Sequence, residues 1–142
     1  MNEYSAVTVE RLGPVARVTM NRPKQLNAFN RDLRRDLLNA VREVNDDEAI
    51  RVCILTGAGR AFCAGADLTE QPSDNFRVDD QLNHEYKPTL LAITEADKPW
   101  ISAINGPAAG IGSAFAMACD LSVIGEQAYL YQAFTAIGLV PD

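Results

Sequence analysis

The sequence predicts an α/β protein in which much of the strand pairing is parallel. Short apolar, β-branched runs at 51–57 and 100–104 alternate with segments in which apolar residues recur at helical spacing. The 142 residues are 47% hydrophobic, which is enough to bury the core of one domain of ordinary size. We therefore expect a single α/β unit over residues 1–142, without internal repeats.

The first third predicts a hairpin followed by a helix. Two alternating segments, 4–10 and 15–20, flank the turn at Gly13 and Pro14. A loop rich in Pro and Asn covers 21–30, and Asn30 is a suitable N-cap. The helix after it would bury one apolar face, formed by Leu33, Leu37, Leu38, Val41 and Val44.

The remaining elements alternate in the same way. The apolar run 51–57 predicts a strand covered on both faces, and the polar stretch 69–80 predicts a loop or mobile lid. A second helix is expected over 79–96, before Pro99, followed by a buried strand at 100–104. Three glycines then lead into an almost uncharged, buried helix. Two short strands follow at 121–125 and 128–131, and Gly138 would close one final helical turn.

Composition excludes several classes of function. The chain has 19 acidic residues against 13 Lys and Arg, a formal charge of −6, which disfavours a nucleic-acid partner. It lacks an apolar run of bilayer length and a secretory signal, so we expect a cytoplasmic protein without a membrane partner. Three cysteines without a C-x-x-C pair indicate reduced thiols, and a single histidine argues against a His-rich metal site.

Two glycine-containing loops, 57–68 and 105–112, each follow a predicted strand. Such loops expose backbone N–H groups beside small side chains, and the second would also open a helix near Ile111. This is the outline of an oxyanion hole. The alternative is the glycine-rich turn of a nucleotide-dependent dehydrogenase, but no acidic residue ends a strand about 20 residues further on.

Four segments in this order resemble the crotonase superfamily, the enoyl-CoA hydratases and isomerases: NRPKQLNAFN, VCILTGAGRAFCAGADL, ISAINGPAAGIGSAFAMACDLSVIGEQAYL and AFTAIGLVPD. The resemblance covers nearly the whole chain. It implies a spiral of β-β-α units and a coenzyme A thioester ligand, with no permanently bound cofactor. It also implies a homotrimer or a hexamer made of two trimers.

The resemblance also implies which residues form the site. The backbone amides of Ala66 and Ile111 would bind the thioester oxygen, although family members commonly carry glycine at the position of Ile111. Gly110 and Phe134 would border the acyl group. The CoA path would involve Lys24, Gln25 and Leu26, together with Ala64, Gly65, Ala66, Asp67 and Leu68.

The sequence departs from the hydratase pattern at two positions. The two glutamates that handle water in hydratases are replaced by Ala114 and Phe134, which cannot transfer a proton. Asp142 matches a position at which several isomerases of the family carry an acidic residue. We therefore expect an acyl-CoA isomerase or lyase in which Asp142 is the base, rather than a hydratase.

Family members continue well beyond the position of Asp142, into a helical region that covers the acyl pocket. The chain is thus expected to be the N-terminal part of the family domain, truncated before those helices. A second interpretation is a noncatalytic acyl-CoA-binding or assembly module. His84 is expected to be a surface helical residue, Cys63 a small buried residue, and Tyr129 and Tyr131 core aromatics.

Overall fold

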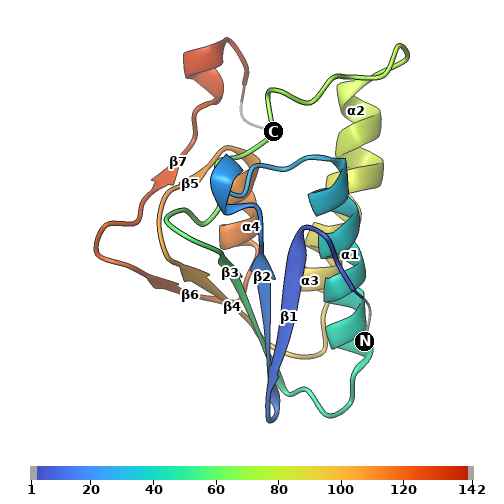
Figure 1. Ribbon diagram of the computed structural model, residues 1–142, viewed down its shortest axis with the longest axis vertical. Helices are drawn as coiled ribbons and strands as arrows, with labels where there is room; N and C mark the ends of the chain where they lie inside the picture. Colours follow the sequence, from blue (N-terminus) through green and yellow to red (C-terminus); the bar gives the residue numbers. More distant parts are fainter. Residues whose placement is uncertain (1–2, 141–142) are drawn as a thin grey trace.

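A five-stranded sheet in the order β1-β2-β3-β4-β6 forms the centre of the protein (Figure 1). The structure is a computed structural model, and it describes residues 3–140. The strands are β1 (Val7–Leu12), β2 (Val15–Met20), β3 (Val52–Gly57), β4 (Trp100–Ile104) and β6 (Leu121–Ile124). β1 and β2 form the predicted antiparallel hairpin, and β2, β3, β4 and β6 pair in parallel. The α/β prediction is confirmed.

Helix α1 (Arg31–Asp46) covers one face of the sheet, beside β1 and β2. As predicted, the side chain of Asn30 caps it by accepting a hydrogen bond from the Leu33 amide at 3.0 Å. The apolar face of α1 is buried, except that Leu38 is only half-buried. Burying this face supplies much of the hydrophobic stabilisation of the fold.

The predicted helix over 79–96 is three joined segments: α2 (Val78–Gln81), the π-helical turn η2 (Leu82–Tyr86) and α3 (Lys87–Thr94). In η2 the Lys87 amide donates to the carbonyl of Leu82, five residues earlier. Pro88 follows at once and has no amide hydrogen, so the wider turn adjusts the helix where a proline would obstruct regular hydrogen bonding. α3 packs against α1.

The last third forms a small second layer. The two-residue strands β5 (Ala108–Ala109) and β7 (Leu130–Tyr131) pair in parallel, and β5 was not predicted. Helix α4 (Ile111–Met117) follows β5, and the single turn η3 (Phe134–Ile137) ends at Gly138 in the left-handed conformation, as predicted. In Figure 1, β7 and η3 lie on the side of the molecule away from α1 and α3.

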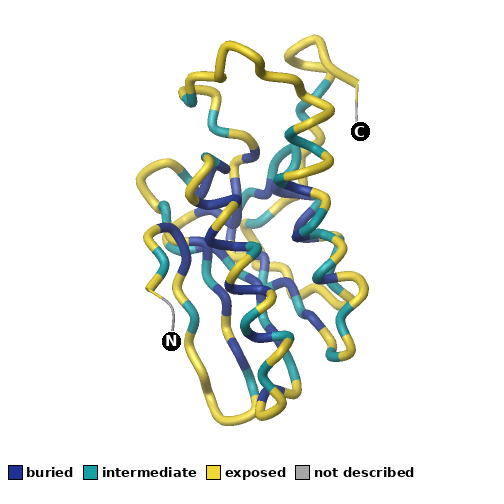
Figure 2. The backbone as a smooth tube through the Cα atoms, turned by 90° about the vertical axis from the view of Figure 1, so that its right-hand side faces the viewer, coloured by how far each residue is buried: buried dark blue, intermediate teal, exposed yellow. Residues whose placement is uncertain are grey.

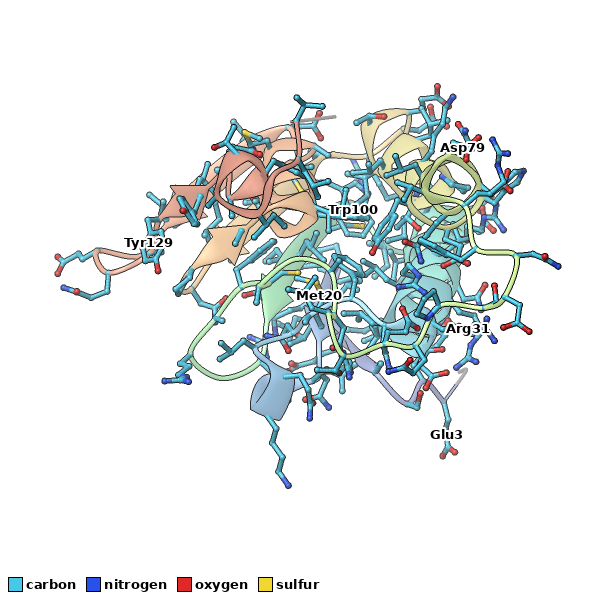
Figure 3. The ribbon with its side chains drawn as sticks, turned by 90° about the horizontal axis from the view of Figure 1, so that it is seen from above. Glu3, Met20, Arg31, Asp79, Trp100 and Tyr129 are labelled. Carbon is cyan, nitrogen blue, oxygen red and sulfur yellow. The ribbon has the colours of Figure 1, made fainter. Side chains whose placement is uncertain are left out.

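Burial differs from the prediction in three places. Only one face of β3 is fully buried, since Val52, Ile54 and Thr56 are half-buried. α4 is buried on one side, whereas Met117 at its end is 55% exposed. Tyr129 and Tyr131 are not core aromatics, because both side chains lie at the surface. Figure 3 shows Tyr129 at the outer edge, whereas Trp100 lies among the crowded side chains of the centre.

Buried backbone concentrates in the sheet and in the inner faces of its helices, and the segments at the upper end are mostly exposed (Figure 2). The exposed segments include 71–80 and the C-terminal turn. The sequence predicted a loop over 69–80, but residues 78–80 already belong to helix α2. The candidate site lies beside the C-terminal turn and the start of the second helical region.

Candidate active site

The two glycine-containing loops meet directly. Cys63 forms an isolated parallel bridge with Ala108, and the Ala109 amide donates to the Cys63 carbonyl at 2.9 Å. A Cβ atom on Gly112 would lie only 2.5 Å from that same carbonyl oxygen, so only glycine allows this close approach. The fold therefore brings segments 64–68 and 109–112 to one place, as the sequence analysis expected of the two loops.

A cavity of about 280 Å³ opens where these loops meet. Seven of the sequence-predicted site residues line it: Ala64, Gly65, Ala66, Leu68, Gly110, Ile111 and Phe134. The other walls come from the helical segment 78–86 and from the C-terminal turn. Its lining is largely apolar, which suits a hydrocarbon chain better than a charged group.

Ala66 and Ile111 both line this cavity, and among residues 3–140 neither backbone nitrogen donates a hydrogen bond. For Ile111 this follows from its place as the first residue of α4, where an amide has no partner within the helix. For Ala66 it follows from the bridge to Phe29, because that bridge uses the Phe29 and Asp67 amides as donors and the Gly65 and Phe29 carbonyls as acceptors, and leaves the Ala66 amide without an acceptor. Two free donors therefore border one apolar cavity.

Hydrogen bonds and an ion pair hold the Ala66 loop in position. The Phe29 amide donates to the Gly65 carbonyl at 2.7 Å, and the Asp67 amide donates to the Phe29 carbonyl at 2.9 Å. Arg22 forms a salt bridge to Asp67 at 3.0 Å. Hydrogen bonds from Thr69, together with the Arg22 charge, hold the pKa of Asp67 below its usual range, so this carboxylate stays ionised and acts as a structural anchor.

The Ile111 loop is held from the other side. The Gly110 amide donates to the Tyr131 carbonyl at 2.9 Å, and the buried Ser113 hydroxyl donates to the Gly110 carbonyl at 2.7 Å. Gln132 in turn donates to the Ser113 hydroxyl at 2.8 Å. The segment around β7 therefore fixes the orientation of the peptide before Ile111.

The predicted CoA-contacting residues of the first loop lie apart from the cavity. Lys24 and Gln25 are exposed in the short helix η1 (Pro23–Gln25). Leu26 connects this segment to the site, because its carbonyl accepts a hydrogen bond from the Ala64 amide at 3.0 Å. Lys24 is therefore exposed in the segment that precedes Leu26.

The positions that differ from the hydratase pattern also border the site. Phe134 lines the cavity itself, and Ala114 lines a neighbouring pocket of about 210 Å³ that shares Ile111 and Tyr86 with it. Neither side chain can carry a proton. Asp142, the predicted base, lies outside the described residues.

Two other candidates have structural roles. Burial raises the pKa of the Cys63 thiol to about 12, so it is not a ready nucleophile, and the prediction of a small buried residue is confirmed. His84 is exposed on the helical segment, as predicted, and its Nδ1 lies 2.8 Å from the Asp80 carbonyl. Within 3–140, no cluster of three or more His, Cys, Asp or Glu residues could hold a metal ion.

Three residues around the site were not predicted from the sequence. Asn27 is fully buried, and Arg34 is 5% exposed and forms salt bridges to Glu70 and Glu85. Tyr86, which lies within the predicted helix over 79–96, borders the cavity. A polar residue within an apolar pattern is the one signal that could have pointed to Arg34.

Comparison with known proteins identifies the family of the chain. Residues 10–142 match the family model described as enoyl-CoA hydratase/isomerase. The chain is 37% identical to 1,2-epoxyphenylacetyl-CoA isomerase of Escherichia coli, covering 90% of this chain and 50% of that protein. It is 38% identical to 2,3-dehydroadipyl-CoA hydratase of the same organism, covering 96% and 53%.

A solved structure shows the same fold. The crystal structure of an enoyl-CoA hydratase from Mycobacterium avium subsp. paratuberculosis superposes with a TM-score of 0.87 at 31% identity, covering 100% of this chain and 56% of that one. The chain therefore belongs to the enoyl-CoA hydratase/isomerase family and has the crotonase fold. It spans about half the length of the relatives it matches.

The dehydrogenase interpretation does not hold. Strands β2, β3, β4 and β6 follow one another across the sheet in chain order, without the reversal at which a dinucleotide-binding sheet holds its ligand.

No helix within residues 3–140 has the length and apolar character required to cross a bilayer.

Proposed function

We propose that the protein binds an acyl-CoA thioester and stabilises its enolate through the Ala66 and Ile111 amides. The observation that carries this proposal is the pair of unpartnered N–H groups on one apolar cavity. Removing a proton from Cα moves negative charge onto the thioester oxygen. Two preorganised donors that bind this oxygen lower the barrier most strongly where water is excluded.

The reaction we favour is isomerisation rather than hydration. The proton leaves Cα, the enolate forms, and a proton returns to a different atom of the acyl group, so the composition of the substrate does not change. Hydration by the two-carboxylate route requires groups that activate water, and Ala114 and Phe134 cannot do so. Among the relatives both a hydratase and an isomerase occur, so the family alone does not decide between them.

Removal of one amide tests the oxyanion proposal. In Ile111→Pro the N–H is lost, and proline is tolerated at the first position of a helix, where no hydrogen bond within the protein is broken. We expect exchange of the Cα hydrogens of butyryl-CoA in D2O, followed by NMR, to slow about 100- to 1,000-fold. Thermal unfolding should show that the fold is retained.

Ile111→Ala is the matched control, since it removes the side chain but keeps the amide. It should retain far more exchange activity than the proline variant. Equal rates for Ile111→Pro and the parent protein would contradict the oxyanion proposal, whereas equal losses in both variants would assign the effect to the side chain.

Asp142 is the residue we propose to move the proton, on the strength of the family resemblance. Asp142→Asn removes the base without changing its size, so binding of butyryl-CoA should persist while Cα exchange falls at least tenfold. An unchanged exchange rate would remove Asp142 from the mechanism.

One alternative function has support. The loss of both hydratase carboxylates also suits a protein that binds acyl-CoA without turning it over. Calorimetry that detects butyryl-CoA binding, combined with no Cα exchange above the rate without protein, would favour this alternative. Sedimentation velocity would test the accompanying proposal of a homotrimer or hexamer.

A further inference from the structure

We propose that Ser113 and Gln132 are positioning residues, which set the direction and the donor strength of the Ile111 amide. Neither residue lines the cavity beside Ala66 and Ile111, so both act through the backbone rather than on a ligand. The inference rests on the proposed function, because it takes the Ile111 amide to bind the thioester oxygen. It adds two side chains that control one of the two main-chain donors.

One planar peptide unit joins the Gly110 carbonyl to the Ile111 amide. The unit is trans, so its C=O and N–H bonds point in opposite directions, and a group that fixes the carbonyl also fixes the amide. Gly110 has a φ of 52°, a positive value that glycine adopts readily. The direction of the Ile111 N–H bond therefore depends on what holds the Gly110 carbonyl.

The Ser113 hydroxyl holds this carbonyl. It donates to the Gly110 oxygen at 2.7 Å, whereas the Ser113 and Ala114 amides of the first helical turn donate to the same oxygen at 3.0 and 3.4 Å. Ser113 is 0% exposed, so bulk water does not compete for the bond. The hydroxyl makes the shortest of these contacts, and a substitution can remove it without changing the backbone.

Gln132 sets the direction of the hydroxyl. Its side-chain amide donates to the Ser113 oxygen at 2.8 Å, which leaves the hydroxyl hydrogen to point at the Gly110 carbonyl. The Tyr131 carbonyl accepts from the Gly110 amide at 2.9 Å, so the same short segment holds the glycine at both of its backbone polar groups. Hydrogen bonds in such a chain, where each group donates to the next, polarise one another and strengthen the last donor, the Ile111 amide.

The Ala66 donor is positioned by main-chain atoms instead. The carbonyl of its own peptide unit, that of Gly65, accepts from the Phe29 amide at 2.7 Å. The two donors therefore differ in what holds them. Ile111 is the donor whose strength two side chains can change, and this makes the inference testable by substitution.

Infrared difference spectra of the full chain with butyryl-CoA, carrying 13C at the thioester carbonyl, test the proposal. A hydrogen bond to a carbonyl oxygen lowers its stretching frequency, so binding to the parent protein should lower the frequency of this band. Ser113→Ala should give a smaller shift. It should also slow Cα exchange at saturating butyryl-CoA about tenfold, less than the loss of a whole donor, and leave the dissociation constant within about twofold.

Ser102→Ala is the matched control. Ser102 is also 0% exposed, its hydroxyl lies 2.7 Å from the Ser122 hydroxyl, and it does not line the cavity. This variant should keep the parent's carbonyl shift and exchange rate, and urea unfolding verifies that both variants fold. Equal changes of the carbonyl band in the two variants would overturn the proposal, because they would assign the effect to the loss of any buried hydroxyl.

Gln132→Glu tests the direction of the chain. A carboxylate only accepts, so the Ser113 hydroxyl would turn its hydrogen away from the Gly110 carbonyl, and exchange should slow about as much as in Ser113→Ala. The double variant should be no slower than Ser113→Ala alone, since the glutamate acts through the hydroxyl. Losses that multiply in the double variant would show that the new charge acts on the site directly, and would contradict the proposed chain.

The carbonyl spectra also separate this inference from the proposed function, because they need no turnover. If butyryl-CoA does not bind to the parent protein, or binds without a lower carbonyl frequency, the oxyanion proposal fails and this inference fails with it. If the parent lowers the frequency and Ser113→Ala lowers it equally, the oxyanion proposal stands and the role of Ser113 is refuted.

Discussion

Single residues hold the candidate site together through hydrogen bonds to backbone atoms of distant loops. Asn27 is fully buried and lies in the left-handed region with φ 57°. Its side chain accepts from the Arg22 amide and donates to the Ala58 and Ala61 carbonyls, each at 2.9 Å. One amide side chain therefore joins the loop after β2 to the loop after β3.

Asn27→Ala should destabilise the protein by about 3 kcal/mol, because buried backbone groups lose their partners and alanine is strained at positive φ. Asn27→Gly loses the same hydrogen bonds without that strain, so it should be about 1 kcal/mol more stable than the alanine variant. Urea unfolding monitored by Trp100 fluorescence measures both differences. Equal stability of the two variants would show that backbone strain at this position is negligible.

For single residues, the sequence predicted which backbone amides could take part in chemistry, but not which side chains contact one another in the fold. Ala66 and Ile111 could be nominated from their motifs, and both residues line one cavity. Asn27 and Arg34 could not be nominated, because their roles depend on partners 31 to 51 residues away in sequence. Tyr86 could not be nominated, because only the packed fold shows that it borders the cavity.

Helix α1 packs its apolar face against the sheet and also holds the segment before β1 through hydrogen bonds to Asp36. Asp36 on α1 is 3% exposed, and one of its carboxylate oxygens accepts from the Ser5 amide, the Ser5 hydroxyl and the Ala6 amide at 2.9 to 3.0 Å. Burial would raise the pKa of Asp36, but these hydrogen bonds and Arg35 outweigh it, and the net shift is downward. The carboxylate thus ties the start of β1 to α1.

This gives a pH dependence with a defined sign. Because the pKa is lower in the folded protein than its ordinary 3.8, Asp36 contributes stability at neutral pH that is lost as pH falls below about 4. Asp36→Asn should be less stable than the parent at pH 7 by about 1–3 kcal/mol, with the difference shrinking towards pH 2. Urea unfolding between pH 7 and pH 2 measures this, and a constant difference would contradict the assignment.

The second helical region shows where element prediction fell short. Apolar spacing predicted its approximate bounds, but it could not show that the helix contains a π-helical turn that ends at Tyr86. Helical spacing does put Tyr86 on the face of Leu82, four residues earlier, and both residues line the cavity. It could not show that a cavity lies against that face.

The whole molecule has two unlike edges. At one edge, β1 is interspersed with charged residues such as Glu10 and Arg11, whereas at the other all four residues of β6 are exposed, including Leu121, Val123 and Ile124 at 52–67%. An exposed apolar edge strand offers unpaired backbone groups and apolar side chains for association. Self-association of this chain through β6 is the expected consequence.

Val123→Lys should reduce this association, because a lysine on an edge strand opposes further strand pairing. Sedimentation velocity over a range of protein concentrations should show a smaller rise in average mass than for the parent chain. Thr8→Lys, at an exposed position of β1, is the control and should change little. Equal effects of both substitutions would indicate that net charge, rather than the β6 edge, governs association.

The sequence alone determined the α/β class, the hairpin, the cap of α1, the final turn at Gly138 and the family resemblance, because these depend on local spacing, on turn chemistry and on motifs within a few residues. Only the tertiary structure decided that Ala66 and Ile111 share one cavity, that Tyr86 borders it, and that β6 is exposed. Such features arise when segments far apart in the chain pack together, and residue order alone does not state which polar groups then find partners.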